Sequence, residues 1–153
     1  AWNMIRKHRI LEQYLVERLG YSWDEVDEEA EVLEHAISDT LTNRMWEDLG
    51  QPTHDPHGSP IPNIEGEIIE HDWLPLVDVP LNEAVLVKRI KNRRPEELRY
   101  LADIGLTTGA SLNVKNAAPL KGPLVIEING VDSHAIDYRL AMALQVSYEK
   151  VNK

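Results

Sequence analysis

The sequence contains no cysteine, and this absence excludes disulfides, zinc sites made of thiolates and cysteine nucleophiles. It also lacks any run of about 18 apolar residues, the length that a membrane-spanning helix needs, and no signal-peptide pattern opens it. Basic residues number 16 against 26 acidic ones, which gives a net charge of -10. Because binding to nucleic acid usually requires a basic face that neutralises phosphates, the chain as a whole opposes that role and favours cations.

What the sequence does contain is enough for one ordinary domain or two small ones, since 42% of its 153 residues are hydrophobic and 27% are charged. Ser22 and Glu25 have the spacing of a capping box, and Ser38 can cap a further helix. A loop rich in proline and glycine, THDPHGSPIPN, follows these caps. Apolar residues at helical spacing predict three helices before this loop, over residues 3–19, 22–36 and 38–49.

The pattern changes at about Leu81, where short runs of alternating apolar and polar residues indicate β-strands. A helix over 95–106 and a helical turn over 138–144 interrupt them, and Asn129-Gly130 is a strong hairpin signal. The predicted strands cover residues 84–90, 110–117, 122–128, 131–136 and 145–151. We therefore expect an α+β chain in which a helical domain (1–64) and a linker (65–80) precede a small β-barrel (81–153).

Three potential metal ligands lie close together in the second predicted helix. Glu31 precedes Glu34 by three residues and His35 by four, so a helix places all three side chains on one face. A pair at the same spacing, His8 and Glu12, lies in the first predicted helix, and one metal-binding region draws on both helices if they pack side by side. Two carboxylates and an imidazole suit Mn(II), Fe(II), Co(II) or Zn(II), whereas Mg(II) gains little from an imidazole. The alternative is a solvated acidic helix face with an ordinary surface ion pair.

Asp55 and His57 lie in the turn-rich loop, where a proline fixes one φ and a glycine frees another. Their side chains can therefore converge on one point. The alternative is a capping aspartate beside an incidental histidine, and the neighbouring His54 could replace either residue. His71 and His134 stand alone in the sequence, and we interpret them as structural or exposed.

Patterns that would indicate an enzyme are weak. A di-metal carboxylate oxidase needs two Glu-x-x-His pairs, and the predicted helices contain none. A hydrolase triad needs an activated serine or cysteine beside a histidine and an acid, and no nucleophile-elbow motif occurs. We therefore expect a binding protein that is not an enzyme.

Three blocks, RKHRILEQYLVERLG, EEAEVLEHAISD and HDPHGSPIP, occur in an order and spacing that resemble the diphtheria-toxin-repressor family of metal-dependent transcription regulators. LRYLADIGLTTGASLNV and GPLVIEINGVDSHAI are similar to the SH3-like domain of its longer members, which is related to the iron-transport accessory domain. The resemblance covers nearly the whole chain. It implies a helical metal-binding and dimerisation domain followed by an SH3-like barrel, and a start inside the helix that follows the family's N-terminal winged helix.

The resemblance implies a primary metal site that contains His8, Glu31, Glu34 and His35, together with a ligand from the missing N-terminal region. Glu31 occupies a position that is cysteine in iron-responsive members and glutamate in manganese-responsive ones, and a carboxylate is a harder donor than a thiolate. We therefore expect Mn(II) or Fe(II) as the cofactor, with a preference for manganese, while Zn(II), Co(II) or Ni(II) substitute in vitro.

An ancillary site is implied by the same resemblance. Glu12 and His57 match its ligands, and Asp55 falls where some manganese-responsive members have a cysteine. A further carboxylate of the SH3-like domain can join it, for which we select Glu97 over Glu96. Asp27 departs from the histidine of the iron-responsive pattern, which argues against a strictly iron-type site.

The function that the resemblance implies is the metal-sensing and dimerisation part of a divalent-metal-dependent regulator in the cytoplasm, a repressor of metal uptake. It would form a homodimer through Met45, Trp46 and Leu49 with apolar residues of the second helix, and these side chains would otherwise belong to the core. Operator DNA would contact the missing winged helix, not this chain. The alternative is a metal-binding accessory module of a metal transport system that does not bind DNA.

Overall fold

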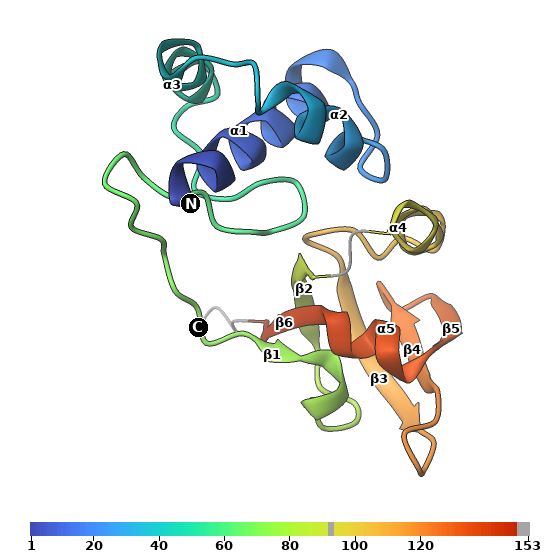
Figure 1. The fold of residues 1–153 in the computed structure, drawn as a ribbon. Helices are drawn as coiled ribbons and strands as arrows, with labels where there is room; N and C mark the ends of the chain where they lie inside the picture. The colour runs from blue at the N-terminus through green and yellow to red at the C-terminus, as the bar shows by residue number, and fades with distance from the viewer. Residues whose placement is uncertain (92–93, 150–153) are drawn as a thin grey trace. The chain divides into compact units, whose positions relative to one another are not determined.

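A computed structural model describes residues 1–91 and 94–149, which fall into two compact units that divide between His71 and Asp72 (Figure 1). Helices make up the first unit and an antiparallel sheet dominates the second, so the predicted α+β class is confirmed. Within the described part of the chain, no helix combines the length and apolar character that crossing a membrane requires.

The first unit is built around α1 (Trp2–Leu19), which contacts both α2 (Val26–Leu33) and α3 (Asp39–Asp48). Gly20 ends α1 in the left-handed conformation, with a φ of 73°. The core of this unit includes apolar side chains that recur at helical spacing on α1 and α2, namely Ile10, Leu11, Leu15, Val26 and Ala30. Their burial fixes which faces of α1 and α2 meet, and therefore which polar side chains lie beside that contact.

The second helix is shorter than the predicted range of 22–36. The capping box is not formed: the backbone carbonyl of Ser22, at 3.2 Å, accepts the N–H of Val26, and Glu25 at the N-cap makes no side-chain hydrogen bond. Trp23 instead donates its ring N–H to the carbonyl of Pro56 in the later loop, at 2.9 Å. A turn therefore precedes α2, and a second turn follows it. The cap of α3 is as predicted, because the Ser38 hydroxyl accepts the Leu41 N–H at 3.1 Å.

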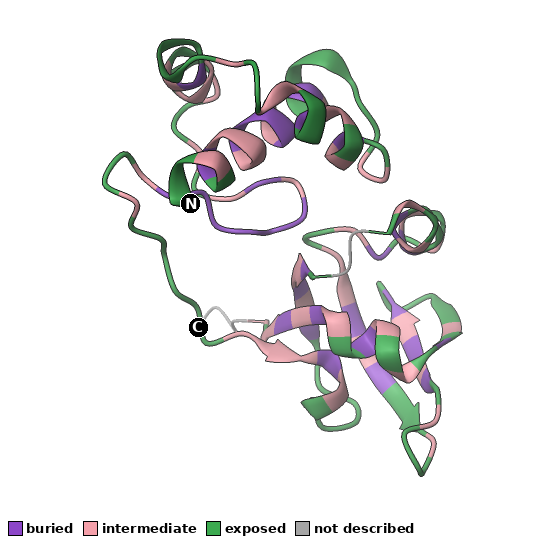
Figure 2. Ribbon diagram, in the orientation of Figure 1, coloured by how far each residue is buried: buried purple, intermediate pink, exposed green. Residues whose placement is uncertain are grey.

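The loop after α3 is irregular but buried, as the purple segment in Figure 2 shows. Its ends are joined by an antiparallel bridge between His54 and Pro60. Asp55 Oδ1 accepts the backbone N–H groups of His57 at 2.9 Å and Ser59 at 2.8 Å. These bonds satisfy amides that a buried loop would otherwise leave unpaired. The predicted turn is confirmed, and it presents its side chains toward α1.

The elements of the second unit are β1 (Leu74–Pro75), a 3-10 turn η1 (Leu76–Asp78), β2 (Val85–Ile90), α4 (Pro95–Asp103), β3 (Ser111–Ala117), β4 (Leu124–Ile128), β5 (Asp132–Ile136), α5 (Tyr138–Ala143) and β6 (Leu144–Tyr148). The strands form a six-stranded antiparallel sheet in the order β1-β6-β2-β3-β4-β5. At the β4–β5 turn, Asn129 and Gly130 have φ values of 52° and 75°, which confirms the hairpin. Part of the predicted linker belongs to this unit, since β1 pairs with β6 and Leu76 is fully buried. The predicted closing strand reaches residues 150 and 151, which lie outside the described residues.

Candidate metal centre

Two groups of ligand-type side chains converge in the first unit, and Glu12 belongs to both. One group is His8, Glu12 and Asp27, and the other is Glu12, Asp55 and His57. In each group, one nitrogen or oxygen per residue lies within 4.8 Å of the others. Glu12 is 0% exposed, so a carboxylate sits in the interior between two histidines. We refer to these five residues as the Glu12 centre.

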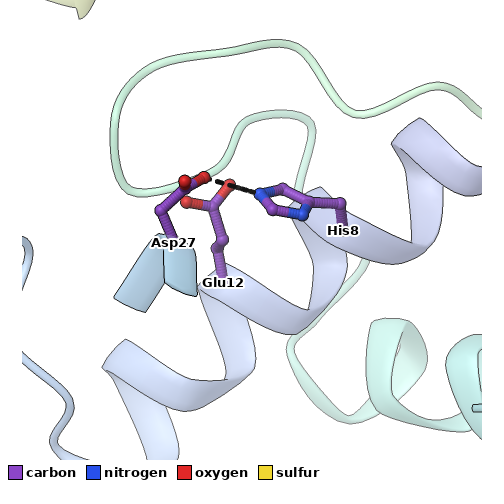
Figure 3. Close-up of side chains that lie close together, drawn as sticks. All are labelled: His8, Glu12 and Asp27. Carbon is purple, nitrogen blue, oxygen red and sulfur yellow. Dashed lines mark hydrogen bonds and ion pairs between the residues drawn. The ribbon is translucent and has the colours of Figure 1, made fainter. Parts of the chain in front are cut away.

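The first group joins α1 to the start of α2, and Figure 3 shows its three side chains pointing toward one another. His8 Nε2 lies 2.8 Å from Asp27 Oδ1 and 3.3 Å from Glu12 Oε1. Burial alone lowers the pKa of His8, but the hydrogen bonds and negative charges of Asp27 and Glu12 outweigh it and raise the pKa to about 10. His8 is therefore protonated at neutral pH, and its proton occupies the space between the two carboxylates.

The other ring nitrogen of His8 faces the end of α2. His8 Nδ1 lies 3.4 Å from Glu34 Oε2, and Glu34 Oε1 lies 3.9 Å from His35 Nε2. The prediction of one continuous helix face was wrong, because α2 ends at Leu33 and only Glu31 lies within it. Both Glu31 and His35 are exposed, and the side chain of His35 is 69% accessible. The structure therefore brings Glu34 to His8, but leaves Glu31 and His35 at the surface.

The second group joins α1 to the turn-rich loop and is buried throughout. Glu12 Oε2 lies 3.2 Å from His57 Nδ1, and Asp55, which shapes the turn, is 4% exposed. The other nitrogen of His57, Nε2, lies 2.7 Å from the carbonyl oxygen of Trp23. Donation to this carbonyl fixes a proton on Nε2 and turns Nδ1 toward Glu12, the way a protein orients a metal-binding imidazole.

The electrostatics of the second group resemble those of the first. Burial lowers the pKa of His57, but the hydrogen bond and charge of Glu12, the charge of Asp55 and the Trp23 carbonyl together raise it. Two carboxylates and an imidazole that are withdrawn from water need a compensating cation. In the metal-free protein the two carboxylates favour the protonated form of His57, and a divalent ion can supply the positive charge in its place. The donor set therefore fits a divalent metal.

Glu97 lies on α4 in the second unit, and its surroundings are basic. Its Oε1 atom is 3.6 Å from Arg94 Nη1 and 3.5 Å from Arg139 Nη2. Glu96 is exposed and lies 3.0 Å from Arg94 Nη2. Both acidic residues thus have cationic partners within the second unit.

Two residues outside the predicted ligand set have close ligand-type neighbours. Asp27 shares one acidic helix stripe with Glu31 and Glu34 in the sequence, and the structure places its Oδ1 atom 2.8 Å from His8 Nε2. His71 was interpreted as isolated, but its Nε2 lies 2.8 Å from His54 Nε2. No sequence signal could pair these two histidines, which are 17 positions apart and share no regular element.

Comparisons with known proteins agree with this division of the chain. The family model described as "Iron dependent repressor, metal binding and dimerisation domain" matches residues 1–63, and the FeoA domain model matches residues 74–148. Among the curated relatives, the iron-dependent repressor IdeR of Mycobacterium leprae is 28% identical over 163 aligned positions, which cover 99% of this chain and 69% of that protein. The diphtheria toxin repressor of Corynebacterium glutamicum is 33% identical, with 99% of this chain and 68% of that protein covered. A solved manganese-dependent transcriptional repressor in complex with manganese is 38% identical, with a TM-score of 0.91, 97% of this chain and 71% of that chain covered.

The helical unit, the sheet unit and these matches define a metal-dependent transcriptional regulator rather than an enzyme. The chain belongs to the diphtheria toxin repressor family of iron- and manganese-dependent repressors, and its second unit is the SH3-like FeoA domain. The comparisons thereby favour the regulator over the alternative of a transport accessory module.

Proposed function

We propose that the first unit senses Mn(II) through the Glu12 centre and transmits metal binding to operator DNA through a homodimer. The observation that carries this proposal is the buried Glu12 carboxylate, which faces His8 at 3.3 Å and His57 at 3.2 Å. A fully buried carboxylate that faces two imidazoles forms a site for a cation, and burial makes each interaction stronger than on the surface.

The metal ligands that we propose fall into two sets that share Glu12. His8, Glu12 and Asp27 would hold one ion at His8 Nε2, and Glu12, Asp55 and His57 would hold another. The contacts of His8 Nε2 with Glu12 and Asp27 support the first set, and the burial of all three members supports the second. Glu34 faces the other ring nitrogen of His8, and it stays, with Glu31, His35 and Glu97, a prediction from the family resemblance as a further ligand.

Manganese is the metal that the donor chemistry favours. The two sets contain carboxylate oxygens and imidazole nitrogens but no sulfur, and the chain has no cysteine. Hard oxygen donors with few imidazoles suit Mn(II) and Fe(II), whereas a thiolate would favour softer ions. The solved repressor that resembles this chain at 38% identity is manganese-dependent, which also supports Mn(II).

The homodimer interface that we propose is an apolar groove on the first unit. It has a volume of about 340 Å³ and is open to solvent. Leu19 and Leu41 at its edges are 61% and 52% exposed, an arrangement that a second copy would cover. The sequence predicted Trp46 as part of this interface. Its ring N–H makes a hydrogen bond within the first unit, to the Pro52 carbonyl at 3.0 Å. The groove is lined by Leu11, Tyr14, Leu15, Leu19, Leu33, Ala36, Ile37, Leu41 and Met45.

Metal binding and dimer geometry share structural elements in this proposal. The Glu12 centre connects α1, α2 and the buried loop, while the groove is lined by residues of α1, α2 and α3. Metal affects DNA binding only if it binds one arrangement of these elements better than another. We propose that DNA itself is contacted through the family's N-terminal winged helix rather than through residues 1–153, whose net charge is -10.

A calorimetric titration of the metal-stripped chain with Mn(II), and in parallel with Mg(II), tests this function. We expect saturable Mn(II) binding that Mg(II) does not reproduce, because Mg(II) gains little from the imidazoles of His8 and His57. Equal affinity for the two ions would mean that the acidic side chains act as a general cation surface, and the sensor proposal would be abandoned.

A further inference from the structure

A pair of histidines outside the Glu12 centre has the geometry of a separate metal site. His54 Nε2 and His71 Nε2 face each other at 2.8 Å, and the two ring centroids are 5.0 Å apart with a tilt of 38°. His54 is half-buried in the loop that follows α3, and His71 is exposed at the end of the first unit. Both ligand atoms are therefore within reach of an ion from solvent.

The hydrogen bonding around His54 presents a ring nitrogen to a metal. Thr53 Oγ1 lies 2.8 Å from His54 Nδ1. In the tautomer whose Nδ1–H donates a hydrogen bond to this hydroxyl, His54 Nε2 carries a lone pair and accepts a hydrogen bond from the Nε2–H of His71. Histidines that bind metals in proteins usually have this arrangement, in which a hydrogen bond fixes one imidazole nitrogen and the other nitrogen is directed at the ion.

The distance between the two nitrogens is close to that of a metal-bridged pair. With Zn–N distances of about 2.0–2.1 Å and tetrahedral angles, two coordinated nitrogens lie roughly 3.3 Å apart. The observed 2.8 Å is shorter by about 0.5 Å. The two nitrogens would therefore move apart by this amount when an ion replaces the proton of their hydrogen bond. Because His71 is exposed, its side chain can make this movement at little cost.

We propose that His54 and His71 bind one Zn(II)-type divalent ion at a site separate from the Glu12 centre, with water among the remaining ligands. The donors that the geometry joins are imidazole nitrogens, which suit Zn(II) better than Mn(II). The ion would tie the loop that carries Asp55 and His57 to the last residue of the first unit. The site does not depend on the Glu12 centre, whose donors are mainly carboxylates.

Histidine-ring NMR during a titration of the metal-stripped chain with Zn(II) tests the proposal, because each of the six histidines reports separately. We expect the ring Nε2 signals of His54 and His71 to move together with one midpoint. In His71→Ala, the response of His54 should shift to a Zn(II) concentration at least about tenfold higher, and in Thr53→Val by about tenfold, the usual effect of losing a group that orients a ligand.

The control is His134→Ala, which removes a histidine of β5 and should leave the His54 and His71 responses unchanged. Amide spectra of each variant establish that it is folded. The proposal is overturned if His54 responds in His71→Ala at the wild-type midpoint. It is equally overturned if neither ring responds at Zn(II) concentrations that shift His8 and His57.

Discussion

Replacing Glu12 by glutamine removes the carboxylate that both ligand groups share, while it keeps the size and shape of the side chain. The two oxygens of Glu12 face His8 at 3.3 Å and His57 at 3.2 Å, so an amide must direct its NH2 group at one of these rings. That group cannot bind a metal, and the remaining oxygen carries no net charge. The substitution therefore weakens both metal sites at once.

The expected loss of affinity follows from the position of Glu12. Changing a group that only orients a metal ligand typically costs about 10–100-fold. Because Glu12 is itself a fully buried ligand, we expect its loss to cost at least about 100-fold in Mn(II) affinity, or about 2.7 kcal/mol. Calorimetric titration with Mn(II) measures this change directly.

The matched control is Glu28→Gln, which makes the same chemical change at an exposed position in the first turn of α2. Its Mn(II) affinity should equal that of the wild type. Circular dichroism of both metal-free variants establishes that they are folded before they are titrated. The reasoning fails if folded Glu12→Gln binds Mn(II) within about threefold of the wild-type affinity, a difference below 1 kcal/mol.

Three further predictions concern pH, dimerisation and a helix cap. The pKa of His8 is raised from 6.5 to about 10, so the stability that its protonated ring contributes is fully present below the unfolded value and is lost as the pH rises through the folded value. Between pH 6.5 and about 10, the metal-free wild type should therefore lose more free energy of unfolding, measured in urea, than His8→Gln loses. Leu41→Asp should turn the dimer into a monomer in sedimentation at micromolar concentration, because Leu41 borders the apolar groove. Ser38→Ala should lower the free energy of unfolding by about 1 kcal/mol in urea titrations, because it removes the cap of α3.

Each of these predictions has a control or an outcome that contradicts it. Parallel pH profiles for the wild type and His8→Gln would contradict the raised pKa. Val131→Asp places the same charge at an 81% exposed position of the second unit and should leave the dimer intact. A dimer in Leu41→Asp would assign the interface to another surface. Unchanged stability in Ser38→Ala would mean that the Leu41 N–H finds another acceptor.

The sequence was sufficient for the helices and strands whose signals are local. Apolar spacing predicted α1, and alternation predicted the strands β2 to β4. The turn around Asp55 was also predictable, because its proline, glycine and aspartate determine the backbone without help from distant residues.

What the sequence could not supply depends on contacts between distant segments. The short length of α2 and the exposure of His35 follow from turns at both ends of this helix. The turn that precedes α2 contains Trp23, whose ring N–H donates to the Pro56 carbonyl of the later loop. The approach of Asp27 to His8 requires α1 and α2 to pack in one register, which helical spacing alone leaves open. The 17-position separation of His54 and His71 has no periodic signature at all.

The most direct test of the Glu12 centre is an anomalous-diffraction map from crystals of this chain grown with Mn(II). Our account predicts anomalous peaks within about 2.6 Å of Glu12 oxygens and of ring nitrogens of His8 or His57. Peaks that lie only beside exposed Glu31 and His35 would contradict it, if the contacts of Glu12 with His8 and His57 stay as they are in the metal-free protein.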